Sequence, residues 1–421
     1  MIIQAKGTIR QMYDVIVVGG GAAGLMAAGF AAQRGLKVAV LERNARVARK
    51  LMITGKGRCN LTNLCGRDDF MSAITANPRF LYSAYSAFSP YDTVDFFEAL
   101  GVPTKTERGN RVFPQSDKAV DIVDALHSFA TDSGADILHG RAIALIIKDG
   151  AVCGVKCENG EKIEARAVII ATGGMSYPKT GSTGDGYALA KQAGHSIIKP
   201  TPSLVPLNIH EGFCEHLMGL SLKNVAIRVV DTVTERTIYT DMGEMLFTHF
   251  GVSGPMILSA SAHMRKTPPE RCKIYIDMKP ALDEKTLDNR LLRDFSENIN
   301  RELINSLDKL LPKKLIPVVI RLSGLQPKQK VNQITKRQRL EFINTIKSLP
   351  LTVTSFRPID EAIITSGGVD TKQIEPKTMR SKLCNNLYFA GEVIDVDAYT
   401  GGFNLQIAFS TACIAGKNVL Q

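Results

Sequence analysis

Three features of exported and membrane proteins are missing from the sequence. No apolar run approaches the roughly 18 residues that a membrane span needs. Residues 1–11 carry charges but no long apolar stretch and no small-residue cleavage site, so we expect no signal peptide. The eight cysteines are scattered and form no C-x-x-C pair. We therefore expect reduced thiols in a cytoplasmic protein that starts at Met1 or Met12.

Metal-site spacings, repeats and low-complexity tracts are missing as well, so no metal is expected. The composition is 44% apolar and 22% charged, which is ordinary for a globular protein. At roughly 150 residues per domain, the length allows two or three domains with large cores.

Acidic residues are fewer than basic ones, so the formal net charge is +11. Basic residues are dense from Arg301 to Arg339, where no aromatic residues interleave with them. A solvated helix face is the favoured interpretation of this stretch, and a nucleic-acid surface is the alternative. The positive field would also attract anionic cofactors and substrates.

Local patterns near the N-terminus predict a strand, a helix and a second strand. The apolar run from Tyr13 to Gly19 ends in glycines and is typical of a buried parallel strand. The alanine-rich segment from Ala22 to Arg34 predicts a helix, and Lys37 to Leu41 predicts the second strand. Together they form a βαβ unit of about 30 residues.

A G-x-G-x-x-G motif joins the first strand to the helix. Gly19 permits the tight turn, Gly21 lets the backbone approach a pyrophosphate, and Gly24 lets the helix pack closely on the strand. Glu42, about 20 residues further on, is placed to bind ribose hydroxyls, with Arg43 beside it. The motif in this context predicts a dinucleotide-binding protein, since the helix N-terminus favours an anion.

The rest of the chain predicts further elements around this unit. They are helical segments over 77–88 and 93–100, a strand pair over 104–113, a helix over 117–131, a hairpin over 136–157, a buried strand over 165–171, a β-rich stretch over 195–277, a helical stretch over 283–349, a last strand over 387–390 and a helix over 401–420. The two ends of the chain are expected to close one discontinuous domain. We expect a cofactor domain over 12–194 and 355–421, a β-rich inserted domain over 195–280 and 350–354, and a helical insert over 281–349.

Motifs distant from the glycine loop distinguish the dinucleotide. The run Arg58-Cys59-Asn60 follows the second strand, a later strand ends in Ala171-Thr172-Gly173-Gly174, and Ala390-Gly391-Glu392 lies near the C-terminus. This order resembles the glutathione-reductase-like flavoproteins. The resemblance implies a Rossmann-like domain that binds FAD non-covalently, rather than a domain for NAD alone.

Longer runs narrow the resemblance. RKLMITGKGRCNLTN, THFGVSGP, TSGGVD and FAGEVIDVDAYTGGFNLQIAFSTA are similar to the YhiN/BaiN-type flavoproteins, described as NAD(P)/FAD-dependent or aminoacetone-oxidase-like enzymes. The match runs from about Tyr13 to the C-terminus. It implies an α/β fold: a Rossmann-like FAD-binding domain with an inserted β-barrel-like domain and a helical domain.

The resemblance also implies roles for single residues. Gly19, Gly21, Ala23 and Gly24 would hold the pyrophosphate, and Glu42 and Arg43 the adenosine ribose region. Lys50, Arg58, Cys59 and Asn60 would lie along the flavin and its ribityl phosphate. Ala142, Thr172 and Gly173 would line the adenine end. Gly391 with Glu392, or Asp395, would bind the ribityl chain, and Gly402, Phe403, Asn404 and Leu405 would face the flavin pyrimidine.

No catalytic residue is assigned, and Cys59 and His249 are weak candidates. Cys59 and Cys65 have five residues between them, unlike the C-x4-C of disulfide reductases, so packing is favoured over a redox pair. A capping role is favoured for His249 over one facing the flavin.

Three functions stay open at this point. The favoured one is NAD(P)H-linked hydride transfer through the flavin to a small organic substrate, such as an activated double bond. The second is an amine-type oxidase that uses oxygen, and the third a flavin-bound regulatory or RNA-associated protein. Gly181 to Gly186 is not a second nucleotide loop, because its glycine order is wrong and no strand with a terminal acid follows. NAD(P)H would therefore dock transiently on the flavin. Nucleic acid and membrane partners are not expected, and the oligomeric state is open.

Overall fold

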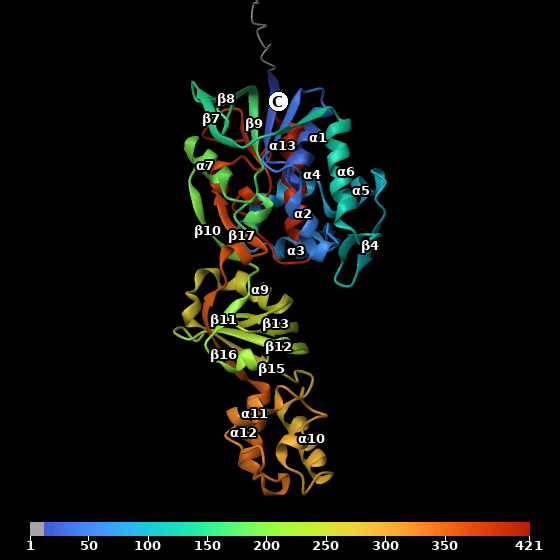
Figure 1. Cartoon of the computed structure of the whole chain (residues 1–421), viewed down its shortest axis with the longest axis vertical. Helices are drawn as coiled ribbons and strands as arrows, with labels where there is room; N and C mark the ends of the chain where they lie inside the picture. The colour runs from blue at the N-terminus through green and yellow to red at the C-terminus, as the bar shows by residue number, and fades with distance from the viewer. Residues whose placement is uncertain (1–11) are drawn as a thin grey trace, which may run out of the picture. The chain divides into compact units, whose positions relative to one another are not determined.

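The computed structural model describes residues 12–421, so the expectations about residues 1–11 lie outside it. Two compact units divide the chain (Figure 1). The first ends at Pro202 and resumes from Ile363 to Gln421, and the second is Ser203–Ala362. The expected fold class is confirmed: the first unit is a Rossmann-type α/β unit, and the second contains a closed barrel.

A seven-stranded sheet forms the centre of the first unit. Its order is β6 (Ala135–His139), β2 (Val38–Glu42), β1 (Tyr13–Val18), β9 (Lys162–Ile170), β8 (Ala151–Cys157) and β7 (Ala142–Lys148), with β18 (Leu387–Phe389) also on β9. β1 pairs in parallel with both β2 and β9. These central strands are almost continuously apolar, because helices and loops cover both faces of a parallel sheet.

Helix α1 (Ala22–Ala32) is apolar around its whole circumference, as a fully buried helix must be. Helices α13 (Phe403–Asn418) and α6 (Ala119–Asp132) lie beside it (Figure 1). A Cβ atom at Gly416 would lie 2.4 Å from the Ala27 carbonyl oxygen, and one at Gly29 would lie 2.2 Å from the Phe129 ring. The two ends of the chain therefore share one tightly packed core.

The expected hairpin over 136–157 is partly wrong. β7 and β8 form the hairpin at the Asp149–Gly150 turn, but β6 pairs in parallel with β2 at the opposite edge of the sheet. The physical reason is that α6 carries the chain back across the sheet, so the strand after it runs parallel to β2.

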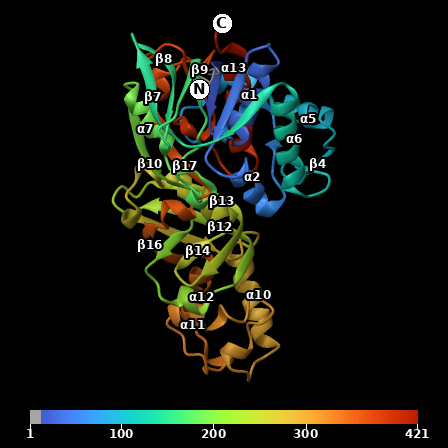
Figure 2. The ribbon, with the colours of Figure 1, turned by 45° about the horizontal axis from the view of Figure 1, so that its top comes forward.

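The smaller elements of the first unit complete it. They are α2 (Arg49–Ile53), α3 (Arg67–Ser72), α4 (Tyr82–Ala87), α5 (Pro90–Ala99), α7 (Asp185–Gln192), the sheet of β3 (Thr62–Asn63), β5 (Arg111–Pro114) and β4 (Thr104–Glu107), and the pair β10 (Ile197–Ser203) and β17 (Ile364–Val369). β10 and β17 lie beside α7 (Figure 2). α5 begins three residues before the expected Thr93, because Ser89 and Asp92 form a capping box.

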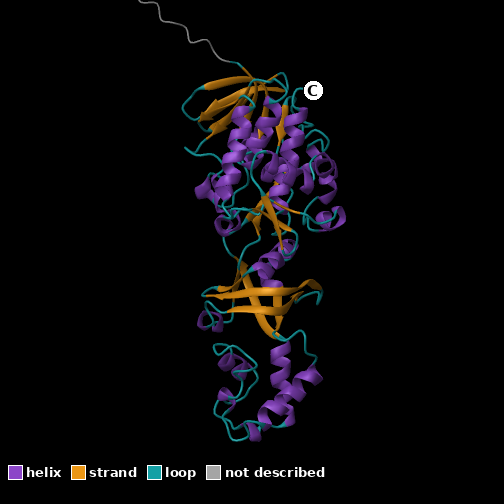
Figure 3. Ribbon diagram, turned by 90° about the vertical axis from the view of Figure 1, so that its right-hand side faces the viewer, coloured by secondary structure: helices purple, strands orange, loops and turns teal. Residues whose placement is uncertain are grey.

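The second unit contains the barrel and helices inserted between its strands (Figure 3). The barrel order is β11 (Leu207–Ile209), β14 (Gly251–Ser253), β13 (Thr237–Thr248), β12 (Ser221–Asp231), β15 (Cys272–Asp277) and β16 (Leu349–Phe356). The helices are α8 (Phe213–His216), α9 (Pro255–His263), α10 (Glu284–Ser296), α11 (Ile316–Leu322) and α12 (Lys336–Lys347). One hydrophobic cluster includes both Phe247 of the barrel and Phe342 of α12. The three-part domain division stays a prediction. Residues 195–202, expected in the β-rich domain, lie in the first compact unit, and residues 355–362, expected in the cofactor domain, lie in the second.

Candidate functional site

The glycine loop lies at the carboxyl end of β1, between β2 and β9, where the strand order reverses. Gly19 has a φ of +105°, and a Cβ atom there would lie 2.6 Å from the Ala171 carbonyl oxygen. A Cβ atom at Gly24 would lie 1.8 Å from the Gly19 carbonyl oxygen. Gly21 differs, since nothing lies within 4 Å of its Cβ position. Gly19 and Gly24 therefore serve the packing of the loop, whereas Gly21 borders open space.

That open space adjoins the N-terminus of α1. Gly21 is the N-cap residue, and no side chain caps the helix. Free N–H groups at a helix end attract an anion, and Ala23 lies in this first turn. The loop thus fits a pyrophosphate, because the bare backbone and the space above it are both present.

Glu42 ends β2 and is held beside this loop. Its Oε2 atom accepts a hydrogen bond from the Gly20 N–H at 2.8 Å. Its Oε1 atom accepts from the Asn44 N–H at 2.8 Å and from Asn44 Nδ2 at 2.6 Å. Sequence reasoning missed Asn44, although an Asn two residues after the acid was a signal for such a turn.

An ion-pair network forms at the predicted adenine end. Arg141 binds Asp185 in a bidentate pair, with Nε–Oδ2 at 2.8 Å and Nη2–Oδ1 at 2.9 Å. Arg43 Nη1 reaches the same Oδ2 atom at 3.2 Å. The Arg141 hydrogen bond lowers the pKa of Asp185 below its usual range. Ala142 follows Arg141 and is buried, so this network holds the strand end that carries it. Sequence reasoning missed Asp185 and Arg141.

The strand end after β9 lies close to the start of α7. Gly173 has a φ of +72°, and a Cβ atom there would lie 3.2 Å from Ser182 Oγ. A Cβ atom at Gly186 would lie 2.1 Å from Thr172 Oγ1. Thr172 and Gly173 thus abut the Gly181 to Gly186 loop, which leads into α7.

Glu392 forms the centre of a second polar cluster. Its Oε2 atom lies 2.7 Å from Lys50 Nζ. Its Oε1 atom accepts hydrogen bonds from the Thr365 N–H at 2.8 Å and from Ser176 Oγ at 3.1 Å. The Lys50 and Glu392 side chains are 25% and 21% exposed, so the pair borders solvent. The structure brings together two predicted residues, Lys50 and Glu392, with Ser176 and Thr365, to which the sequence analysis assigned no role.

Asp395 is placed differently from Glu392, its predicted alternative. It is 6% exposed, and its carboxylate accepts a hydrogen bond from Asn77 Nδ2 at 2.9 Å. Gly391, which precedes Glu392, has a φ of +76°, and a Cβ atom there would lie 2.8 Å from the Ala23 Cβ. Gly391 therefore lets this segment pass close to α1, and Asp395 anchors it to the loop that carries Asn77.

The N-terminus of α13 is a second uncapped helix end. Gly402, its N-cap residue, has a φ of +100°, and a Cβ atom there would lie 2.3 Å from the Thr62 carbonyl oxygen. Asn404 Nδ2 donates to the Ala398 carbonyl at 2.9 Å and so fixes the preceding loop. Phe403 packs against Phe70 with ring centroids 5.4 Å apart, and Leu405 packs against the same core. Backbone N–H groups of this helix end are thus held in place and uncapped by any side chain.

The three residues of the Arg58-Cys59-Asn60 loop lie in different environments. Arg58 Nη2 lies 2.6 Å from Asp117 Oδ1, and the guanidinium stacks on the Phe113 ring at 4.2 Å from its centroid. The Arg58 charge is therefore paired with an acid and an aromatic ring of the chain itself. Cys59 is completely buried, and burial raises the pKa of its thiol well above its usual range. All eight cysteines are free, and a buried neutral thiol is a poor nucleophile. Asn60 Oδ1 is buried with no hydrogen-bond partner among residues 12–421, as expected for a group that awaits a ligand.

His249 belongs to the second unit. It is exposed, and its ring makes an edge-on contact with Phe250 at 4.9 Å. Its role toward a flavin stays a prediction.

Within residues 12–421, no helix is long and apolar enough to cross a membrane, and no cluster of three His, Cys, Asp or Glu side chains is arranged to hold a metal.

Comparison with solved structures supports the fold. The chain resembles a 3-ketosteroid Δ1-dehydrogenase from Sterolibacterium denitrificans (TM-score 0.54, 13% identity, covering 97% of this chain and 99% of that one). It also resembles a 3-ketosteroid Δ4-(5α)-dehydrogenase from Rhodococcus jostii RHA1 (TM-score 0.52, 15% identity, covering 98% and 97%). At these identities the likeness shows the fold alone.

Comparison by sequence defines the family. The model of the HI0933-like protein Rossmann domain matches residues 13–418, so the chain belongs to this family. It is 30% identical over 417 residues to a 3-dehydro-bile acid delta(4,6)-reductase of Clostridium scindens, covering 96% of this chain and 98% of that one. It is also 30% identical over 410 residues to a ribosomal RNA dihydrouridine synthase of Escherichia coli, covering 97% and 98%. The protein is an FAD-dependent oxidoreductase of this family.

Proposed function

We propose that the protein reduces a carbon–carbon double bond conjugated to a carbonyl group, with NAD(P)H as the transient reductant. One carbon of the double bond receives a hydride and the other a proton, while NAD(P)H is oxidised to NAD(P)⁺. FAD supplies the hydride-transfer chemistry between these two partners.

The single observation that carries this proposal is the uncapped N-terminus of α13. A fixed helix end with free N–H groups stabilises negative charge, and a reduced flavin carries more of it than an oxidised one. This arrangement favours accepting electrons from a donor such as NAD(P)H.

The relatives support the same reaction class. One is named a delta(4,6)-reductase and another a dihydrouridine synthase. Dihydrouridine is uridine whose C5=C6 bond, conjugated to a carbonyl, has been saturated. Both names describe reduction of an activated double bond in unrelated substrates, which supports a common reaction rather than a common substrate.

The side chains have distinct roles in this proposal. The Gly19 to Gly24 loop binds the pyrophosphate, and Glu42 turns from its loop contacts to the ribose hydroxyls. Lys50 and Glu392 orient the ribityl chain. Cys59 has a packing role rather than a catalytic one, since burial holds its thiol protonated. The remaining cofactor assignments, from Arg43 to Leu405, stand as part of the same proposal.

Anaerobic mixing of the purified protein with NADH or NADPH tests the reductase. We expect the flavin band at about 450 nm to bleach and then to recover when a small enone is added. No bleaching with either nucleotide would overturn the proposal. Bleaching by a primary amine instead, with hydrogen peroxide formed in air, would favour the amine-type oxidase.

A further inference from the structure

The ion pair of Lys50 and Glu392 is joined by a bridging hydroxyl. Lys50 Nζ lies 2.7 Å from Glu392 Oε2 and donates a hydrogen bond to Ser176 Oγ at 2.6 Å. Ser176 Oγ in turn donates to Glu392 Oε1 at 3.1 Å. Among residues 12–421 these are the two partners of the Lys50 ammonium, which leaves one of its three N–H groups free.

Thr365 fixes both Ser176 and the acid. Its Oγ1 atom accepts hydrogen bonds from the N–H groups of Met175 at 2.7 Å and Ser176 at 3.1 Å. Its own N–H donates to Glu392 Oε1 at 2.8 Å. Thr365 and Ser176 are almost completely buried, and a Cβ atom at Gly174 would lie 2.4 Å from Thr365 Oγ1. The ion pair is therefore attached to tightly packed, buried groups.

The same pair borders the space that the cofactor is expected to fill. Gly391, directly before Glu392, comes so close to Ala23 in the first turn of α1 that a Cβ atom on Gly391 would lie 2.8 Å from the Ala23 Cβ. The Lys50 and Glu392 side chains keep 25% and 21% of their surface exposed. Charges that are partly shielded from water act more strongly on a neighbouring group than charges in bulk water.

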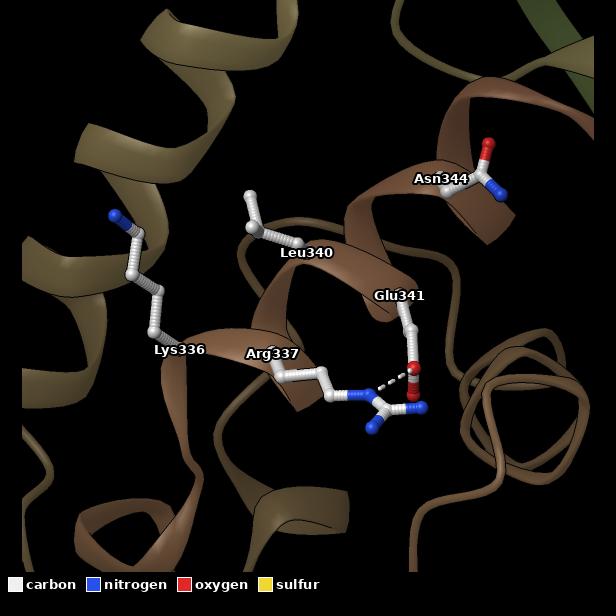
Figure 4. Close-up of a pocket in the computed structure, with 5 residues that line it drawn as sticks. All are labelled: Lys336, Arg337, Leu340, Glu341 and Asn344. Atoms are coloured by element: carbon white, nitrogen blue, oxygen red, sulfur yellow. Dashed lines mark hydrogen bonds and ion pairs between the residues drawn. The ribbon is translucent and has the colours of Figure 1, made fainter.

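Arg337 and Glu341 on α12 form a contrasting ion pair (Figure 4). Arg337 Nε lies 3.1 Å from Glu341 Oε1, and the two side chains are 89% and 50% exposed beside an open groove of the second unit. Exposed pairs of this kind are screened by water and salt and contribute little. This pair has the same two charges without the buried support, so it is a matched control.

The two charges of the Lys50–Glu392 pair largely cancel each other at a distance, because they lie only 2.7 Å apart. Removal of either side chain leaves one full charge beside the cofactor. A reduced flavin carries more negative charge than an oxidised one, so an unpaired Lys50 ammonium favours the reduced form. An unpaired Glu392 carboxylate has the opposite effect.

We infer that the Lys50–Glu392 ion pair, positioned by Ser176 and Thr365, sets the reduction potential of the bound flavin. The inference rests on the placement of FAD in the proposed function and adds an electrostatic role to the orientation of the ribityl chain. Ser176 and Thr365 are positioning residues, because they act on the flavin through the pair.

The reduction potential is measured on the FAD-loaded full chain, reduced stepwise against a reference dye at saturating FAD and without NAD(P)H. In Lys50→Met, the ratio of reduced to oxidised flavin at a fixed potential should fall at least about tenfold, which is about 30 mV for a two-electron couple. In Glu392→Gln it should rise by a similar factor. The double variant should return close to the wild-type value, since both charges are then absent.

Three further variants separate charge from structure. Lys50→Arg keeps the positive charge and should retain a potential near that of the wild type. Arg337→Met and Glu341→Gln, the controls in the second unit, should leave the potential unchanged. Single variants of the Lys50–Glu392 pair that leave the potential unchanged or shift it in the same direction would refute the inference, as would a shift in Lys50→Arg as large as in Lys50→Met.

Ser176→Ala tests the positioning role, because it keeps both charges and removes the bridging hydroxyl. It should shift the potential in the wild-type background and not in the Lys50→Met background, since its effect passes through Lys50. A shift that persists without Lys50 would remove Ser176 from the inference.

Bleaching by NAD(P)H is recorded separately and distinguishes the two proposals. A wild-type protein that does not bleach loses the proposed reductase activity, whereas the potentials of the variants still test the ion pair. Normal bleaching with identical potentials in all variants removes the ion-pair inference alone.

Discussion

The substitution Gly21→Val probes the cofactor site with little effect on the protein itself. Gly21 has φ −81° and ψ −172°, an extended conformation that suits valine, and nothing lies within 4 Å of its Cβ position. We therefore expect the free energy of unfolding of the cofactor-free protein to change by about 1 kcal/mol or less.

FAD binding should respond very differently. A valine side chain would occupy the space that the pyrophosphate needs and keep it away from the N–H groups of α1. Two lost charge-assisted hydrogen bonds cost about 1.5–3 kcal/mol each. The dissociation constant of FAD should therefore rise by about two to four orders of magnitude.

The assay compares flavin absorbance with protein absorbance after purification, followed by titration of the apoprotein with FAD. Gly212→Val is the matched control, because Gly212 also has a negative φ and no atom within 4 Å of its Cβ position, and it lies in the second unit. Gly24→Ala is the structural contrast, since its Cβ would lie 1.8 Å from the Gly19 carbonyl oxygen. It should unfold the unit with or without FAD. A Gly21→Val protein that purifies yellow with full flavin content would refute the reasoning.

Two further predictions concern buried and charged groups of the first unit. Burial lowers the pKa of His195 to about 4, and its Nε2 lies 2.7 Å from Ser381 Oγ. The unfolded chain binds the proton more readily, so stability is full above about pH 6.5 and should fall by about 3 kcal/mol as the pH drops to about 4. Urea unfolding at several pH values checks this; His195→Gln should remove this component of the slope, and an unchanged slope would contradict it. Glu392→Gln should weaken FAD binding about tenfold or more with little change in melting temperature, because Lys50 loses its partner at the ribityl position. Asp395→Asn is the comparison and should lower the melting temperature more than the FAD affinity; the reverse pattern would reassign the ribityl contact to Asp395.

Local patterns were sufficient for the elements that hold the glycine loop. The strand, the turn glycines, the helix and the terminal Glu42 lie within 30 consecutive residues, and the structure places all of them as expected. α13 was predictable for the same reason, since Gly401 and Gly402 precede a continuous apolar stretch. In contrast, β6 was assigned to a hairpin, because its neighbour β2 lies almost a hundred residues earlier in the chain.

The amino-acid sequence by itself thus determined the βαβ unit, the likeness to FAD enzymes and the residues at the N-termini of α1 and α13, since these signals depend on neighbours along the chain. Only the tertiary structure decided which polar groups meet. It joined Lys50 to Glu392 across 342 positions and surrounded them with Ser176 and Thr365. It also engaged Arg58 with Asp117 and buried Cys59 completely. Contacts between side chains so far apart in sequence produce no local sequence pattern, because the packing of the whole unit determines which side chains meet.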